Sequence, residues 1–170
     1  MTTSQHNKKG FTLIELLIVI GILAILLAIT LVALNPAKQF AQSNDTKRRS
    51  DINAILNAIH QFSADNKGLL TGLNIPTEAV AGAGCADANV ATIAGPQAAG
   101  LADMCSLIVP EFMAALPVDP QVNNGDPITE AGCTDIAGYT TGYRVISSAS
   151  NSRVTVCSTG EITVDLSVTR

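Results

Sequence analysis

Near its N-terminus the chain has a long apolar run that differs from everything after it. Residues 11–34 contain one charged side chain, Glu15, and they follow directly on Lys8, Lys9 and Gly10. A helix that crosses a hydrocarbon core of about 30 Å needs about 20 apolar residues. The run therefore predicts a membrane-spanning helix. A carboxylate inside such a helix is costly to place in lipid, so Glu15 is a functional candidate by default.

From residue 37 the chain becomes polar, yet apolar residues recur at steps of three and four, as on one face of an amphipathic helix. The pattern ends at residues 66–68, where glycine after lysine is a typical helix stop. We expect one helix from about Thr12 to Asn66. A kink or local unwinding is expected at Pro36, because proline removes a helix hydrogen bond. The apolar face consists of Phe40, Ala41, Ile52, Ile55, Leu56, Ile59 and Phe62.

Three segments near the C-terminus show the alternation of half-buried strands. They are residues 143–148, 153–157 and 161–168, and their short connections predict an antiparallel meander. The last segment is the clearest, because one side carries Ile162, Val164, Leu166 and Val168. The apolar face of this sheet needs a cover, and the amphipathic helix supplies one. The sequence therefore predicts an α+β fold in which a long N-terminal helix packs on a small antiparallel sheet.

These patterns divide the chain into five parts. Residues 1–10 form a short polar leader, 11–34 the apolar half of the helix and 35–67 its amphipathic half. Residues 68–140 are rich in Gly, Ala, Asn and Thr and are expected to be mostly loop. Residues 141–170 hold the β-meander. The two lysines at the end of the leader place that end in the cytoplasm by the positive-inside rule.

Charge and candidate chemistry narrow the function classes. The formal net charge is −4, and phosphate affinity comes from clustered Lys and Arg, so general nucleic-acid binding is not expected. The one basic triplet, Lys47-Arg48-Arg49, is read as a solvated helix face or as partners for acidic groups of a neighbouring subunit, with DNA contact as the less favoured alternative. His60 stands alone beside the apolar face and is read as packing or solvent-facing. No phosphate loop, nucleophile motif or metal-spaced group occurs, so we expect no enzyme.

Four cysteines, Cys85, Cys105, Cys133 and Cys157, all follow the apolar run. None forms a C-x-x-C pair, so a zinc or redox site is not indicated. If this part of the chain lies outside the cytoplasm, the four cysteines are expected to form two disulfides. Four cysteines allow three pairings. Proximity in the sequence favours Cys85–Cys105 and Cys133–Cys157.

The N-terminal pattern closely resembles that of type IV pilins and of the pseudopilins of type II secretion. The residues that carry the resemblance are Lys8-Lys9-Gly10, Phe11-Thr12-Leu13-Ile14-Glu15 and the apolar run to Ala24. The resemblance covers about the first third of the chain and implies a prepilin with a class III-type leader and the pilin fold. Many family members have a proline where this chain has Val32, which leaves open whether the usual melted stretch occurs here.

The resemblance also implies how the chain is processed, which proteins it interacts with and where it is located. A prepilin peptidase and N-methyltransferase would cut between Gly10 and Phe11 and methylate Phe11. In a filament core Glu15 would then pair with the amino group of Phe11, either its own or that of a neighbouring subunit. The alternative is that Glu15 is a snorkelling residue at the membrane interface. Further implied partners are identical and related pilin subunits and the inner-membrane assembly platform. The implied location is the cytoplasmic membrane, single-pass with a cytoplasmic N-terminus, and afterwards an extracellular surface filament.

The expected function is that of a structural subunit of a type IV pilus or pilus-like filament, acting in adhesion, motility or DNA uptake. A pseudopilin of a type II secretion system is the alternative within the same fold. A single-pass, membrane-anchored binding domain that never polymerises is the alternative from another class. Cleavage after Gly10 with methylation of Phe11 is expected of a pilin or a pseudopilin, and is not expected of the anchored binding domain.

A second resemblance lies at Leu116-Pro117-Val118-Asp119-Pro120. It is similar to the Leu-Pro-x-Asp-Pro element of many major pseudopilins and predicts a rigid corner in which Asp119 bonds neighbouring amides. Some pseudopilins bind calcium in this region, which makes Asp119 and Asp126 candidate ligands. No spacing here matches the twelve-residue calcium loop, so solvated loop carboxylates are the favoured interpretation.

Overall fold

The computed structural model describes residues 10–96, 99–135 and 137–170. The leader residues 1–9, with Lys8 and Lys9, lie outside the described residues. The described chain forms two compact units, which divide between Phe40 and Ala41. Together they have the long N-terminal apolar helix and the small antiparallel sheet of an α+β protein, as in the pilin fold.

The first helix, α1, spans Leu13–Leu34 and is apolar around its whole circumference. It ends at Asn35, which has the left-handed backbone angles φ 40° and ψ 78°. Asparagine tolerates this conformation better than most residues. The second helix, α2, begins directly afterwards and spans Pro36–Asp65. Proline suits the first position of a helix because no amide hydrogen bond is needed there.

The break at Asn35 confirms the expected interruption at Pro36. It also corrects the prediction of a single helix from Thr12 to Asn66, which is in fact two. The helical period continues through both segments, so periodicity alone gave no sign of how complete the interruption is.

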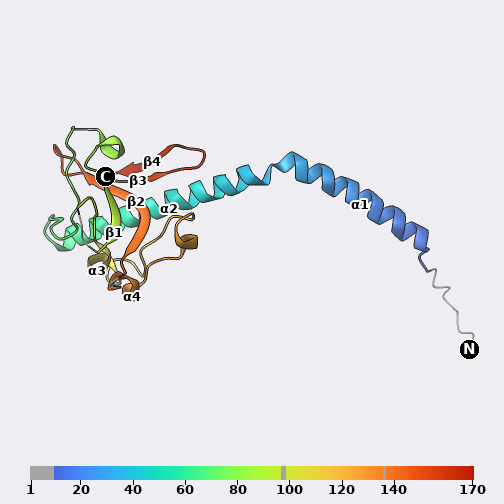
Figure 1. The fold of residues 1–170 in the computed structure, drawn as a ribbon, viewed down its shortest axis with the longest axis horizontal. Coiled ribbons are helices and arrows are strands. Elements are labelled where there is room, and N and C mark those ends of the chain that lie inside the picture. The colour runs from blue at the N-terminus through green and yellow to red at the C-terminus, as the bar shows by residue number, and fades with distance from the viewer. Residues whose placement is uncertain (1–9, 97–98, 136) are drawn as a thin grey trace, which may run out of the picture. The chain divides into compact units, whose positions relative to one another are not determined.

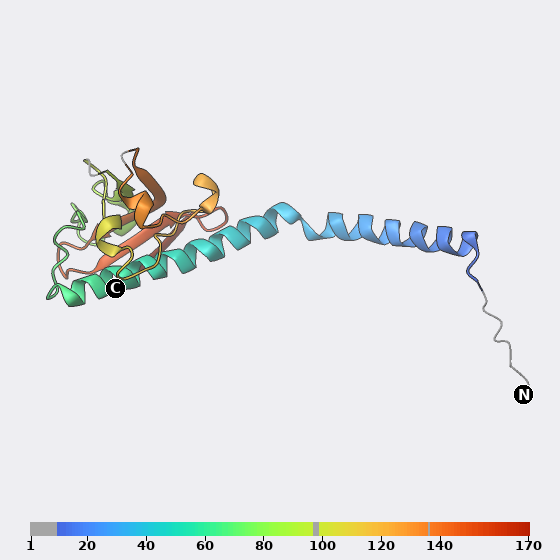
Figure 2. The ribbon, with the colours of Figure 1, turned by 90° about the horizontal axis from the view of Figure 1, so that it is seen from below.

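In the second unit α2 lies along one face of the sheet (Figures 1 and 2). The predicted apolar face is buried from Ile52 to Phe62, whereas Phe40 is 71% exposed and does not join the core. The residues that α2 contributes pack with sheet residues in one hydrophobic cluster, and the main members from the sheet are Tyr143, Val145, Val154, Val156 and Leu166.

The sheet has four antiparallel strands in the order β1-β2-β3-β4. The predicted meander is present as β2 (Tyr139–Ser147), β3 (Val154–Thr159) and β4 (Asp165–Thr169). The first strand, β1 (Ala91–Gly95), was not predicted and lies within the region expected to be loop. Its sequence, Ala-Thr-Ile-Ala-Gly, has only the two β-branched residues Thr92 and Ile93 and no aromatic one, so it is a short and weak strand pattern.

The region between β1 and β2 is tied down by short helical turns. These are α3 (Cys105–Ile108), the 3₁₀ turn η2 (Asn123–Gly125) and α4 (Glu130–Cys133), while a further 3₁₀ turn, η1 (Gly84–Ala86), precedes β1. Cys105 and Ile108 of α3 are buried in the main cluster. The segment between β1 and β2 is therefore rich in loops and also contributes to the core.

One strand prediction was wrong at its start. Residues 161–164 were expected to open the last strand, but β4 begins at Asp165. Ile162 and Val164 are 47% and 71% exposed instead of facing the core. The physical reason is a competing partner: the amides of residues 161–163 bond to the side chain of Asp45 instead of to a neighbouring strand.

The favoured disulfide pairing was also wrong. The structure joins Cys85 to Cys157, 72 residues apart, and Cys105 to Cys133, 28 residues apart. The first bond ties η1 to β3, and the second joins the neighbouring turns α3 and α4. Proximity in the sequence was a poor guide because the entropy of closing a loop grows only slowly with its length.

We predict that the protein carries these two bonds. Proteolysis without reduction, followed by mass spectrometry, should give one linked peptide pair containing Cys85 and Cys157 and another containing Cys105 and Cys133. Closing a loop of 72 residues stabilises the fold by about 4 kcal/mol in the chain-entropy model. Recovery of Cys85–Cys105 peptides from native protein would contradict the structure.

Candidate functional site

The predicted cleavage position lies just ahead of α1. Gly10 and Phe11 are both exposed, and Phe11 is 85% accessible. A Cβ atom placed on Gly10 would meet no other atom within 4 Å. Among the residues that the structure describes, none covers the peptide bond between Gly10 and Phe11.

Glu15 lies in the first turn of α1 and forms a reciprocal cap with Thr12. Its Oε2 accepts hydrogen bonds from the amide of Thr12 at 2.8 Å and from the Thr12 hydroxyl at 2.7 Å. The Glu15 amide in turn donates to the Thr12 Oγ1 at 3.3 Å. This capping box satisfies two amides that a helix start leaves without partners. The carboxylate is also held at the positive end of the helix dipole.

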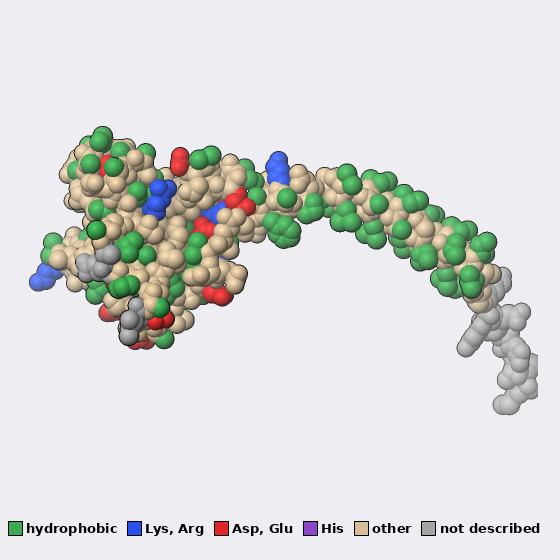
Figure 3. Space-filling model, viewed as in Figure 1, with side chains coloured by type: hydrophobic (Ala, Val, Ile, Leu, Met, Phe, Trp, Pro, Cys, Tyr) green, Lys and Arg blue, Asp and Glu red, His purple; other side chains and the backbone are tan. Residues whose placement is uncertain are grey.

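The rest of α1 presents apolar side chains on every side. None of its residues is buried. Hydrophobic side chains cover it along the length visible in Figure 3. By length and composition α1 can cross a membrane, with a mean hydropathy of 3.2 over its most apolar window. Such a helix, together with the leader motif, fits a membrane-anchored protein.

A second constellation, which the sequence analysis did not predict, surrounds Arg48 on α2. Arg48 is only 1% exposed. Its guanidinium makes a two-pronged contact with Asp119, through Nε at 2.7 Å and Nη2 at 2.9 Å. Its Nη1 donates to Asp45 at 2.9 Å and to Glu161 at 3.0 Å. We call these four residues the Arg48 cluster.

The Arg48 cluster joins three parts of the fold. Asp119 comes from the proline-rich corner at residues 116–120 and also accepts the Gln121 amide at 2.9 Å, as expected for this corner. Glu161 comes from the loop after β3. Asp45 accepts the amides of residues 161, 162 and 163 at 2.8, 3.0 and 3.1 Å. Helix α2, the corner and this loop are therefore held together by one buried cation.

The pKa values reflect these bonds. Burial raises the pKa of Asp45, but the three amides and Arg48 together outweigh it and lower that pKa to about 2. Burial likewise raises the pKa of Asp119, and the bonds from Arg48 and the Gln121 amide bring it below its usual value. Both carboxylates are therefore ionised at neutral pH, as the buried guanidinium requires.

The basic triplet was misread at its central residue. Lys47 and Arg49 are exposed, but Arg48 is buried and paired, so the three do not form one cationic patch for DNA. The sequence did contain a signal that Arg48 lies on the buried side of the helix. Arg48 stands four residues before Ile52, on the apolar face, and three residues after Asp45, the spacing of an intrahelical ion pair.

The calcium candidates have different environments. Asp119 is buried and bonds to Arg48, so a cation already faces its carboxylate. Asp126 is exposed. Among residues 10–96, 99–135 and 137–170 no group of three or more His, Cys, Asp or Glu side chains is placed to hold a metal ion.

One comparison with known proteins is informative. Residues 5–31 match the family model of the prokaryotic N-terminal methylation motif. This motif belongs to structural rather than enzymatic proteins. No curated protein and no solved structure gives a significant match. The motif supports a type IV pilin-like prepilin with a class III leader, and the α+β fold agrees with it.

We predict that Arg48→Met lowers the free energy of unfolding by about 3–5 kcal/mol, because it leaves buried carboxylates without their cation. This corresponds to a fall of about 10 °C in Tm for a chain of this size. Thermal unfolding of the full chain in detergent, followed by circular dichroism, measures it.

The matched control is Arg49→Met, one residue along on the exposed side of α2. It should change Tm by no more than about 2 °C, as expected for a surface substitution. Equal Tm values for the two variants would show that the Arg48 cluster contributes little to stability.

Proposed function

We propose that this protein is a structural subunit of a type IV pilus or pilus-like filament. The observation that carries the proposal is the methylation motif on a helix whose side chains are all exposed. A helix that is apolar all round is either buried among other apolar helices or placed in lipid. A pilin helix uses both environments in turn, first the bilayer and then the filament core.

In this proposal the chain first lies in the cytoplasmic membrane with its N-terminus in the cytoplasm. Prepilin peptidase cuts between Gly10 and Phe11 and methylates Phe11. An inner-membrane assembly platform then moves α1 from lipid into a filament with identical or related subunits. The exposed bond after Gly10 is compatible with the first step. The polar surface of the second unit is compatible with a position outside the membrane.

Glu15 acts in this proposal at two stages. In the precursor its charge is stabilised by Thr12 within the same helix turn. Cleavage creates a positive amino group on Phe11, and in a filament core this group of a neighbouring copy becomes a partner for Glu15. A buried ion pair whose partner is removed leaves an uncompensated charge, which costs about 3–5 kcal/mol. Glu15 would thus favour one register between neighbouring α1 helices.

Processing is tested by Gly10→Val, because the added branched side chain crowds the bond that the peptidase must reach. We expect uncleaved precursor to accumulate in the membranes of the source cell, measured by the intact mass of the extracted protein. Gly21→Ala is the matched control, since a Cβ there meets no atom within 4 Å and α1 is unbroken around it. Normal cleavage of the Gly10→Val chain would contradict the proposed position.

The role of Glu15 is tested by Glu15→Gln, which keeps the capping box but removes the charge. We expect the yield of sheared filaments to fall by about a hundredfold or more, as the loss of a buried ion pair implies. Thr12→Val is the matched control, because it removes the hydroxyl of the cap and keeps the charge. If Glu15→Gln assembles normally and Thr12→Val does not, capping rather than pairing explains Glu15.

A further inference from the structure

The loop between β3 and β4, residues 160–164, presents apolar side chains on a fixed backbone. Ile162 is 47% and Val164 71% exposed. Single exposed apolar side chains are common and indicate little by themselves. Here, however, the buried carboxylate of Asp45 holds three consecutive amides of the loop.

Gly160 adds to this constraint. A Cβ on this residue would lie 3.0 Å from both carboxylate oxygens of Asp45 and would collide with the Thr163 carbonyl. The loop is therefore packed closely against Asp45, and its conformation is set from within the unit. Val164 contributes little to that packing, and about half of Ile162 stays accessible for a contact outside the loop.

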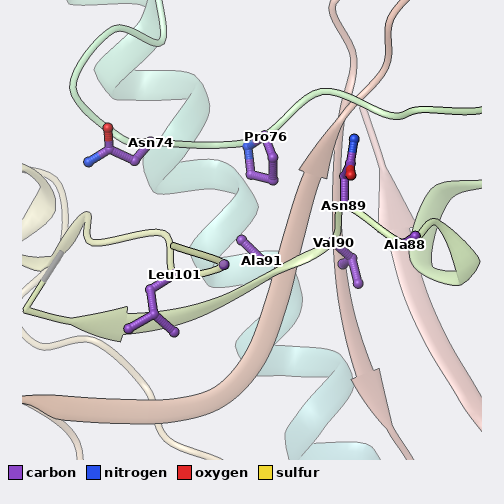
Figure 4. Close-up of a pocket in the computed structure, with 8 residues that line it drawn as sticks. Asn74, Pro76, Ala88, Asn89, Val90, Ala91 and Leu101 are labelled. Atoms are coloured by element: carbon purple, nitrogen blue, oxygen red, sulfur yellow. The ribbon is translucent and has the colours of Figure 1, made fainter. Parts of the chain in front are cut away.

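A cavity lies at the other end of the same sheet. Its volume is about 310 Å³, near the lower bound of about 300 Å³ for small-molecule sites, so it suits a side chain or two better than a cofactor. Figure 4 shows it between the segment after α2, the start of β1 and the segment beside β1. The residues that line it are Asn74, Pro76, Ala88, Asn89, Val90, Ala91, Gly100 and Leu101.

The strand register places the loop and the cavity at opposite ends. The pair Thr159 and Asp165 closes the loop end of β3 and β4. At the opposite end Ser147 pairs with Val154, and a bridge joins Ser147 to Thr77, next to the cavity. A projection and a cavity at opposite ends of one unit can meet only between different copies. Such a contact is heterologous, and repeated without closure it generates a helical filament.

We infer that, in the filament proposed above, the β3–β4 loop of one copy inserts Ile162 into this cavity on the next copy. The inference rests on the proposed function and names the contact between the second units. Charge is compatible with it. The exposed carboxylate of Asp165 follows the apolar loop, and Arg144 pairs in the sheet with Thr92, the neighbour of the lining residue Ala91. Arg144 has no ion-pair partner among the residues that the structure describes.

The contact is tested by cross-linking in the full chain expressed in its source cell. The double variant Ile162→Cys/Ala88→Cys places one new thiol on the loop and one at the cavity, where Ala88 is exposed. Oxidised filaments of this variant should give a ladder of covalent oligomers on a non-reducing gel. Each single variant should give no ladder, because it offers only one half of the contact.

A second variant measures what the contact contributes. Ile162→Asp should lower the yield of sheared filaments by about tenfold, since burying one isoleucine side chain changes an association constant by that order. The matched control is Leu69→Asp, which changes another exposed apolar residue, 59% accessible, outside the loop and the cavity. The control should retain the wild-type yield.

The outcomes separate the inference from the function on which it rests. If the wild-type chain forms filaments, but the double variant gives no ladder and Ile162→Asp assembles normally, the contact is wrong and the pilin proposal stands. If the wild-type chain keeps its leader and forms no filament, both are wrong. Covalent dimers from Ile162→Cys alone would show a symmetric contact between loops and would also overturn the inference.

Discussion

A helix whose side chains are apolar and exposed dominates the energetics of this protein. Sixteen large apolar side chains of α1 are more than half exposed, from Leu13 to Leu34. Burying each is worth about 1.5–3 kcal/mol, so leaving all of them in water costs on the order of tens of kcal/mol. Whole domains are stable by only about 5–15 kcal/mol. The helix therefore requires an apolar environment, such as lipid or the apolar helices of a partner, and that environment must accommodate Glu15, the one charged side chain of α1.

The second unit, in contrast, has its own hydrophobic core, ion pairs and disulfides. Its core lies between α2 and the sheet, and the buried charges of Asp45, Arg48 and Asp119 pair with each other. Two disulfides hold the loop-rich region against this core. Because its fold does not depend on α1 for burial or charge balance, the unit can keep one structure while the surroundings of α1 change. The proposed transfer from membrane to filament needs this independence.

The sequence predicted the features that depend on local periodicity and on the N-terminal motif. The apolar face from Ile52 to Phe62 and the three strands of the meander follow directly from spacing. The features that were missed depend on contacts between distant segments. Asp45 removes residues 161–163 from the last strand, and the disulfides follow the packing of η1 and α3 rather than distance along the chain. Arg48 was misread because a charge was assumed to face solvent, although its position relative to Ile52 placed it on the buried side.

The central claim is that α1 is released from its leader and becomes the core of a filament. Mass spectrometry of filaments sheared from the surface of the source cell tests it most directly, because it reports the N-terminal residue of the assembled protein. The account predicts a chain that begins at Phe11 and carries one methyl group on its amino nitrogen. A chain that still begins at Met1 or Thr2, or one that begins after Leu34 and so has lost the helix, would contradict it.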